Sequence, residues 1–235
     1  MSIGEVLDEA WTIYTRFFAK FFLVALIVLV TINTGLALLR ERFDSDSVGD
    51  RFVVGMVGIV ASVVGSLWLE GAFVKSVQTA RTGVFQTPIG ELFRGARPFL
   101  GRLFVSGVLA GLGVCFGVVF FIVPGLIFLT WWALIAPVIV IENRSALGSF
   151  GRSRELVRGN GWTVFGVVVI STLLSVVAAA LVRAAFAFLP PFGEIVIGST
   201  LAQAIVSPFA AIAVTIAYLR LRDLHSPVVA DPAPA

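Results

Sequence analysis

An uncharged run of 39 residues, from Leu103 to Ile141, limits the folds open to this chain more than anything else in it. About 20 apolar residues let a helix cross a hydrocarbon layer of about 30 Å, so the run suffices for two crossings. The rest of the chain has the same character, because 58% of its 235 residues are hydrophobic and 13% are charged. Soluble domains are about 45–50% apolar and about 25% charged. The sequence therefore predicts a polytopic membrane protein rather than a water-soluble fold.

Apolar windows along the chain predict an all-α fold, a bundle of six transmembrane helices. The predicted spans cover residues 17–39, 52–74, 103–123, 126–141, 161–182 and 195–219. They form a single integral membrane domain over residues 1–220, and we expect residues 221–235 to be a disordered cytoplasmic tail. We divide the long run at a hairpin turn formed by Pro124 and Gly125. An interior proline breaks a helix, and a neighbouring glycine permits a tight reversal.

The distribution of basic residues predicts how the chain is oriented in the membrane. Short cytoplasmic loops are enriched in Lys and Arg. One predicted side carries only Arg40, Arg42, Arg51 and Arg183, and the other side carries the remaining thirteen of the 17 basic residues. We therefore expect a multi-pass protein of the cytoplasmic (inner) membrane with both termini in the cytoplasm.

Short cytoplasmic segments between the spans are predicted to be interfacial amphipathic helices. Apolar residues recur at helical spacing in residues 3–18, 89–96 and 146–157, and Ser2 with Glu5 forms a capping-box pattern. The first segment aligns with the second at an offset of 86 residues, Ile3-Gly4-Glu5-Val6 with Ile89-Gly90-Glu91-Leu92. The pattern favours three parallel repeats, each an interfacial helix followed by a helical hairpin.

Four glycines in the third predicted span indicate close helix packing. They are spaced as two small-xxx-small pairs, a pattern that lets helix backbones approach each other. These residues are Gly107, Gly111, Gly113 and Gly117. The alternative, that they line a pore or a ligand pocket, stays open.

The chain is poor in the side chains that build catalytic centres. It has one histidine, His225, and one cysteine, Cys115. A catalytic triad or metal cluster built on several histidines is therefore excluded, and no phosphate-binding loop pattern is present. We expect no enzymatic activity, no cofactor and no metal.

Three carboxylates lie close to the predicted spans, at Glu70, Glu142 and Glu194. Acids inside a membrane are costly and often functional. Each of the three lies at the edge of an apolar window, so we expect all of them to reach an interface. We also predict an interfacial ion pair between Glu142 and Arg144.

Six arginines in two cytoplasmic segments are candidate contacts for anionic lipid or for a membrane protein partner. They are Arg94, Arg97, Arg102, Arg152, Arg154 and Arg158. The alternative is that they only set the orientation of the chain. Nucleic-acid binding would need a larger basic surface and is not expected. The sequence does not predict an oligomeric state.

Two stretches of the chain resemble a known membrane family. Val123-Pro124-Gly125-Leu126-Ile127, followed by Ala136-Pro137-Val138 and Gly159-Asn160, looks like the membrane domain that precedes the catalytic domain of some bacterial glycerophosphodiester phosphodiesterases. The segment from Ile3 to Leu7 is similar to the start of that domain. The resemblance implies a six-helix bundle with interfacial helices. Because 16 residues follow Leu219, too few for a phosphodiesterase barrel, we expect the family's enzymatic activity to be absent.

Three functional hypotheses follow from the sequence. The first is a non-enzymatic scaffold or lipid-interaction module, based on the arginine-bearing cytoplasmic segments. The second is a transporter or lipid-translocating protein with a path between the helices, based on the glycine-rich third span and on Pro137 and Pro208 in the fourth and sixth. The third is a membrane-embedded enzyme acting on lipid headgroups, for which the sequence offers no convincing catalytic set.

Overall fold

The computed structural model describes residues 1–42, 47–81, 88–120, 122–186 and 197–225. All regular structure in these residues is helical. Six helices are long and apolar enough to cross a membrane: Phe18–Leu36, Gly49–Ala80, Gly90–Phe120, Ile122–Glu142, Gly161–Ala185 and Ser199–His225. The prediction of an all-α, multi-pass membrane protein is confirmed.

The elements are, in chain order, α1 Ile3–Arg16, α2 Phe18–Arg42, α3 Val48–Ala80, α4 Ile89–Ala96, the short 3-10 helix η1 Arg97–Phe99, α5 Leu100–Phe120, α6 Ile122–Trp132, α7 Ile135–Glu142, α8 Ala146–Val157, α9 Gly161–Ala185 and α11 Ser199–His225. Two of them depart from the predicted spans in ways that matter for the site. Helix α3 continues to Ala80, and the fourth span is divided into α6 and α7.

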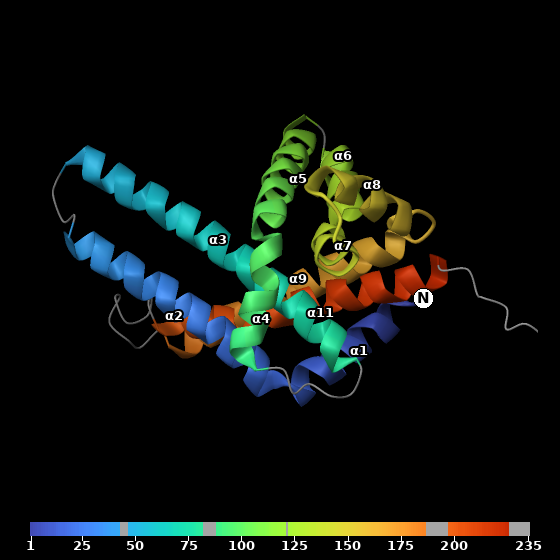
Figure 1. Cartoon of the computed structure of the whole chain (residues 1–235), viewed down its shortest axis with the longest axis horizontal. Coiled ribbons are helices and arrows are strands. Elements are labelled where there is room, and N and C mark those ends of the chain that lie inside the picture. The colour runs from blue at the N-terminus through green and yellow to red at the C-terminus, as the bar shows by residue number, and fades with distance from the viewer. Residues whose placement is uncertain (43–46, 82–87, 121, 187–196, 226–235) are drawn as a thin grey trace, which may run out of the picture.

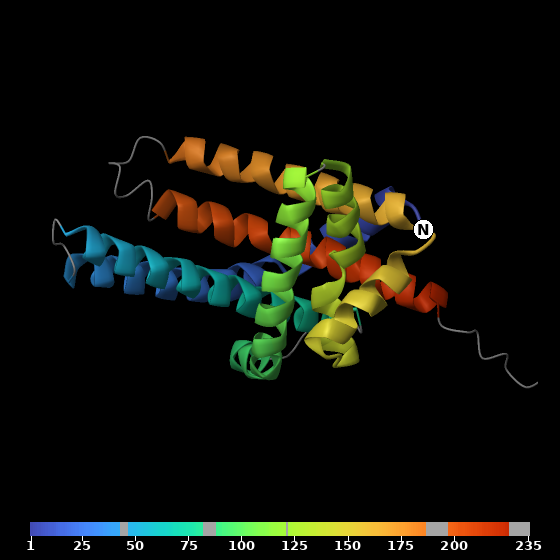
Figure 2. The ribbon, with the colours of Figure 1, turned by 90° about the horizontal axis from the view of Figure 1, so that it is seen from above.

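The long helices form three hairpins that are not disposed alike. Helices α2 and α3 pair along the length of the molecule, as do α9 and α11, whereas the α5–α6 hairpin runs across them in both views (Figures 1 and 2). Helix α11 contacts α9, α2, α1 and α3, so it lies at the centre of the fold. The three units of the predicted repeat are therefore not equivalent in space.

The hairpin turn between the third and fourth spans does not lie at Pro124 and Gly125, where the sequence predicts it. Helix α5 ends at Phe120 and α6 begins at Ile122, so Pro124 and Gly125 lie in the first turn of α6. A proline fits there because the first N–H groups of a helix have no intrahelical acceptor. Glycine has a different role from the one predicted, since a Cβ on Gly125 would lie 2.7 Å from the backbone nitrogen of Val118.

Two of the four predicted packing glycines lie where a methyl group would clash. A Cβ on Gly117 would lie 2.9 Å from the backbone nitrogen of Gly125, and a Cβ on Gly113 would lie 2.7 Å from the Trp132 ring. At Gly107 the nearest contact would be ordinary, 3.5 Å, and Gly111 faces open space. Glycine thus brings α5 and α6 together at one end of their hairpin.

Helices α1, α4 and α8 pack on the long helices. Helix α1 buries Val6, Ala10 and Ile13 and contacts α11 and α9. Leu92 of α4 and Leu156 of α8 are also buried, against α3 and against α5, α6 and α7 respectively. Protein therefore covers part of the apolar face of each helix, and their location at the membrane interface stays a prediction.

Candidate functional site

A cavity of about 400 Å³ lies between α2, α3, α7 and α11. Its apolar lining includes Leu29, Phe73 and Val214. Its polar lining consists of Asn33, Ser62, Ser66, Glu70, Ser199, Gln203, Ser207 and Thr215. Among the lining residues that the structure describes, Glu70 is the one acidic side chain, and none is basic.

The cavity is elongated along the helix axes. Its lining residues on α11 run from Ser199 to Thr215, which corresponds to about 24 Å at a rise of 1.5 Å per residue. Ser62, Ser66 and Gln203 are exposed, so the cavity is open on the side formed by α3 and α11. It therefore extends over most of a hydrocarbon layer of about 30 Å.

Glu70 lies inside helix α3, ten residues before its last residue, Ala80. Arg81, which directly follows α3, contacts Asp223 of α11, and the two helices run toward this contact in the same direction. Counting back along both helices places Glu70 level with residue 212 of α11, about 16 Å from the contact. Helix α3 continues past Glu70 as a buried helix, with Ala72, Phe73 and Val77 in the core. That Glu70 reaches an interface stays a prediction.

Glu70 and Ser207 line the cavity without a partner among the described residues. The carboxylate of Glu70 forms neither a hydrogen bond nor an ion pair there, and the Ser207 hydroxyl is buried without a hydrogen bond. Asn33 and Thr215, in contrast, are hydrogen-bonded. Asn33 Nδ2 donates to Thr200 Oγ1 at 2.7 Å, and Thr215 Oγ1 donates to the carbonyl of Ala211 at 2.7 Å. The cavity therefore offers an acid and a hydroxyl that are available to a ligand.

The fourth span breaks beside the cavity. Helix α6 ends at Trp132 and α7 begins at Ile135, because Pro137 has no N–H to donate to the carbonyl of Ala133. Both Ala133 and Pro137 line the cavity. The sequence predicts a bend at Pro137, and the structure has a complete interruption of the helix.

A single serine on α8 holds the two halves of the broken span. Ser153 Oγ donates to the carbonyl of Trp131 at 2.6 Å and accepts from the backbone N–H of Leu134 at 3.2 Å. Arg154 reinforces this junction, since its guanidinium lies 4.2 Å from the centre of the Trp131 ring. The backbone groups freed by the break are thus satisfied inside the protein, as a low-dielectric environment requires.

Glu142, at the end of α7, is the centre of a dense polar cluster. Its carboxylate accepts from Arg152 Nε at 3.1 and 3.2 Å and from Tyr218 Oη at 3.0 Å. The predicted pair with Arg144 is also formed, with Nε at 3.4 Å. Desolvation alone would lower the pKa of Arg152, but its hydrogen bonds to Glu155 and Glu142 raise it above the ordinary value. No sequence pattern indicated Arg152 or Tyr218 as partners of Glu142, because they are 10 and 76 residues away.

Three of the six arginines proposed for lipid contact have protein partners, and the other three are exposed without an ion pair to the described residues. Arg152 and Arg154 have the partners just described, and Arg102 Nη1 donates to Asn143 Oδ1 at 2.6 Å. That contact holds Asn143 in the left-handed conformation, φ 55°, that ends α7. Arg94, Arg97 and Arg158 are exposed and form no ion pair with the described residues.

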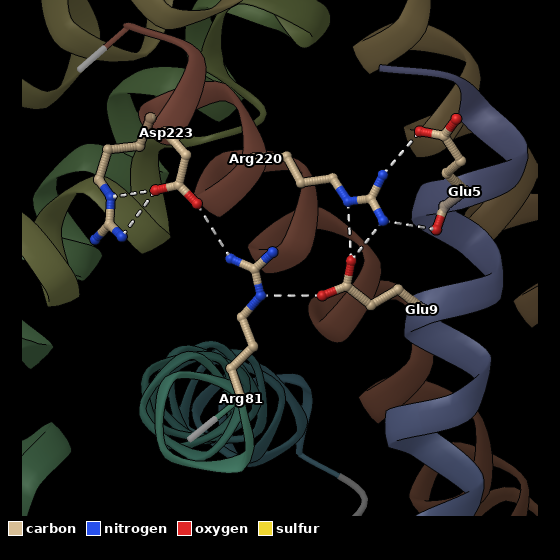
Figure 3. A network of polar contacts seen from close by, with 6 residues as sticks. Glu5, Glu9, Arg81, Arg220 and Asp223 are labelled. Atoms are coloured by element: carbon tan, nitrogen blue, oxygen red, sulfur yellow. Dashed lines mark hydrogen bonds and ion pairs between the residues drawn. The ribbon is translucent and has the colours of Figure 1, made fainter. Parts of the chain in front are cut away.

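A second ionic network joins α1 to the ends of α3 and α11 (Figure 3). Arg220 contacts both Glu5, Nη1–Oε2 2.9 Å, and Glu9, Nη2–Oε2 2.7 Å. Arg81 Nε lies 3.0 Å from the other oxygen of Glu9 and its Nη1 lies 3.5 Å from Asp223. We call these five residues the α1 clasp. Hydrogen bonds from Ser2 are the main cause that lowers the pKa of Glu5, and the charge of Arg220 adds to them.

Comparison with known families covers almost the entire chain. Residues 4–221 match the family described as Domain of unknown function (DUF7847). The chain belongs to this family. No curated protein and no solved structure matches it. The residues matched to DUF7847 include the cavity, the broken span, the Glu142 cluster and the α1 clasp except Asp223.

The cavity carries groups that can bind a ligand. It combines one free carboxylate with hydroxyl and amide groups, which recognise a ligand through charge and hydrogen bonds. Within the described ranges, no group of three or more His, Cys, Asp or Glu side chains gathers at any point. For this member of DUF7847, the cavity is therefore the best candidate for a functional site.

Proposed function

We propose that the protein binds a ligand in the cavity between α2, α3, α7 and α11 and passes it through the membrane, as a transporter or a lipid-translocating protein. The observation that carries the proposal is the unpaired Glu70 carboxylate in a cavity that extends over about 24 Å of membrane-spanning helix. Ionisable residues inside membrane-spanning helices are expensive and are typically found where a substrate or ion passes.

The broken span supports the same function. Secondary transporters commonly place their substrate sites beside discontinuous helices, where irregular backbone lines a cavity. Here the interruption at Ala133 borders the cavity directly. A scaffold needs neither the interruption nor the cavity. Because both features cost stability, their presence favours a function for them.

Accessibility to a charged thiol reagent tests the proposal. The background is Cys115→Ala, because Cys115 is exposed. Single cysteines are introduced at Ser66 and Gln203 in the cavity and, as a control, at Leu173 of α9, which is 60% exposed but lies outside the cavity. In proteoliposomes we expect a membrane-impermeant methanethiosulfonate to label both cavity positions and to leave the control unlabelled.

Two results would overturn the proposal. One is failure of both cavity positions to react from either side, and the other is equal labelling at the control position. Thiol labelling of intact cells tests the orientation of the chain. With both termini in the cytoplasm, as the basic residues predict, a cysteine at Arg152 reacts in intact cells only after permeabilisation.

A second candidate function, contact with anionic lipid, is favoured by the exposure of three of the six arginines. Arg94, Arg97 and Arg158 have no ion-pair partner among the described residues. Replacing all three with Gln is expected to reduce the anionic lipid that copurifies with the protein, whereas Arg183→Gln, at an exposed arginine near the opposite end of α9, leaves it unchanged. Equal lipid content in the two variants would remove this function.

A further inference from the structure

We infer that the ligand of the cavity is a singly charged cationic amphiphile, an alkylammonium in chemical class, which enters from the hydrocarbon layer and pairs its head with Glu70. The inference rests on the proposed function, because it names the class of ligand for the same cavity. Three features of the cavity support it: the charge of its lining, the number of its carboxylates and the side on which it opens.

The charge of the lining selects for a cation. Glu70 is the only ionisable side chain among the described lining residues, so an anion entering the cavity would find no positive group. A cation would find a carboxylate that no arginine already occupies, in contrast to Glu142, which is held by Arg152 and Arg144. A desolvated carboxylate is stabilised as an anion by a paired cation, so a cationic ligand is complementary to Glu70.

The number of carboxylates selects against a divalent metal. Calcium and magnesium are bound by six or more oxygens, usually with several carboxylates or retained waters. The cavity supplies one carboxylate, and much of the remaining lining is hydrocarbon, including Leu29, Leu69 and Phe73. Such a lining is complementary to an alkyl chain attached to the charged head.

The side on which the cavity opens indicates the route of entry. Ser62, Ser66 and Gln203 mark the opening, and exposed apolar side chains of α3 surround it, including Ile59 and Val63. These residues lie within membrane-spanning helices. A ligand that reaches this opening from the side does so through lipid, and an amphiphile concentrates there.

Protection from thiol labelling tests the inference. The full-length protein carries Cys115→Ala and Gln203→Cys, and the probes are hexyltrimethylammonium, hexanesulfonate, 1-hexanol and sodium chloride. The first three share a chain length and differ in the charge of the head. We expect saturating hexyltrimethylammonium to slow labelling about tenfold, and the other probes to leave the rate unchanged.

The Glu70→Gln variant identifies the partner of the head. Its labelling rate without a probe gives the baseline, and the protection by hexyltrimethylammonium is expected to disappear. Glu155→Gln, which removes a carboxylate on α8 outside the cavity, is the matched control and should keep the protection. Size-exclusion chromatography of each variant shows whether the fold is intact.

The outcomes separate the inference from the function on which it rests. Three results would each overturn the ligand class and leave the path intact. They are protection by hexanesulfonate or 1-hexanol as strong as that by the cation, protection by sodium chloride alone, and full protection in Glu70→Gln. Absence of labelling at Gln203→Cys without any probe overturns the path itself.

Discussion

The α5–α8 side of the molecule is closed, whereas the α2–α3–α11 side leaves a cavity. On the closed side the backbones of α5 and α6 approach at Gly117 and Gly125, and Ser153 satisfies both backbone groups at the helix break. On the open side the Ser207 hydroxyl has no hydrogen-bond partner. Both sides are built from long apolar helices, and they differ in which polar groups are paired.

Two glutamates show most clearly what separates the sides. Glu142 accepts hydrogen bonds from Arg152, Arg144 and Tyr218, and Glu70 accepts none from the described residues. Paired polar groups at depth hold helices in place, whereas an unpaired one costs free energy unless something binds it. The partners of a charged residue, more than its type or depth, therefore indicate whether it serves stability or function.

Adding a methyl group on the closed side should have the largest effect. Gly117→Ala forces a Cβ to within 2.9 Å of the α6 backbone at Gly125, where no flexible side chain is available to yield. We expect a loss of about 1–3 kcal/mol in the free energy of unfolding, measured by thermal unfolding in detergent. Gly111→Ala, which faces open space, is the matched control, and equal destabilisation of both variants would contradict the close contact.

Removal of the charge at Glu142 should have the next largest effect. Glu142→Gln leaves Arg152 without its main partner at a site where the Glu142 side chain is only 16% exposed. The expected loss is about 1–2 kcal/mol. Glu155→Gln removes a carboxylate that is 65% exposed and should cost less than about 0.5 kcal/mol. A Glu142 variant as stable as the Glu155 variant would show that the cluster does not hold α7 to α8.

The serine bridge should contribute about as much as one buried hydrogen-bonding group. Ser153→Ala leaves the carbonyl of Trp131 and the N–H of Leu134 without their partner, and we expect a loss of about 1 kcal/mol. Ser66→Ala on the open side is the comparison, because Ser66 Oγ donates only within its own helix, to Val63. Similar melting temperatures for the two variants would mean that the break is held by other contacts.

On the open side, Glu70→Gln should leave stability unchanged or raise it slightly. No pairing is lost, so the free energy of unfolding should stay the same or rise by less than about 0.5 kcal/mol. Ligand protection should be lost in the same variant, a combination that separates a binding residue from a structural one. Destabilisation as large as that of Glu142→Gln would indicate a structural partner for Glu70 and would erase the contrast between the two glutamates.

The α1 clasp should give the smallest effect, as a dependence on pH. The pKa of Glu5 is lower in the folded protein than its ordinary value of 4.5, so Glu5 stabilises the fold above that pH. The contribution is lost as the pH falls through the folded pKa. The melting temperature of the natural protein should therefore decline more steeply below pH 4.5 than that of Glu5→Gln. Parallel curves would mean that Glu5 has the same pKa when the chain is unfolded.

Local patterns in the sequence predicted the spans and some helix ends. The capping box of Ser2 and Glu5 is formed, with Glu5 N donating to Ser2 Oγ at 3.3 Å. The spans followed from hydropathy because lipid imposes the same requirement on every crossing. The position of the hairpin turn did not follow, since proline is as acceptable in the first turn of a helix as in the turn itself.

The site depends on contacts that no local pattern contains. Hydropathy reports that Glu70 follows an apolar stretch, but it does not report that α3 continues past it or that α11 lies opposite. Arg220 contacts Glu5 from 215 residues away, and Ser153 reaches Trp131 from a different helix. The sequence therefore singled out the prolines and polar residues near the cavity but not the arrangement that makes them a site.

The crossing of the α5–α6 hairpin over the other long helices (Figures 1 and 2) has a consequence for the surrounding lipid. When α2, α3, α9 and α11 lie along the bilayer normal, α5 and α6 are tilted from it. The hydrophobic thickness that α5 and α6 span is then shorter than their hydrophobic length. The leaflets must then thin beside this hairpin to cover it. We expect an experimental map in nanodiscs to show the two headgroup layers closest together there, and a uniform thickness around the protein would indicate that the hairpin stands upright in lipid.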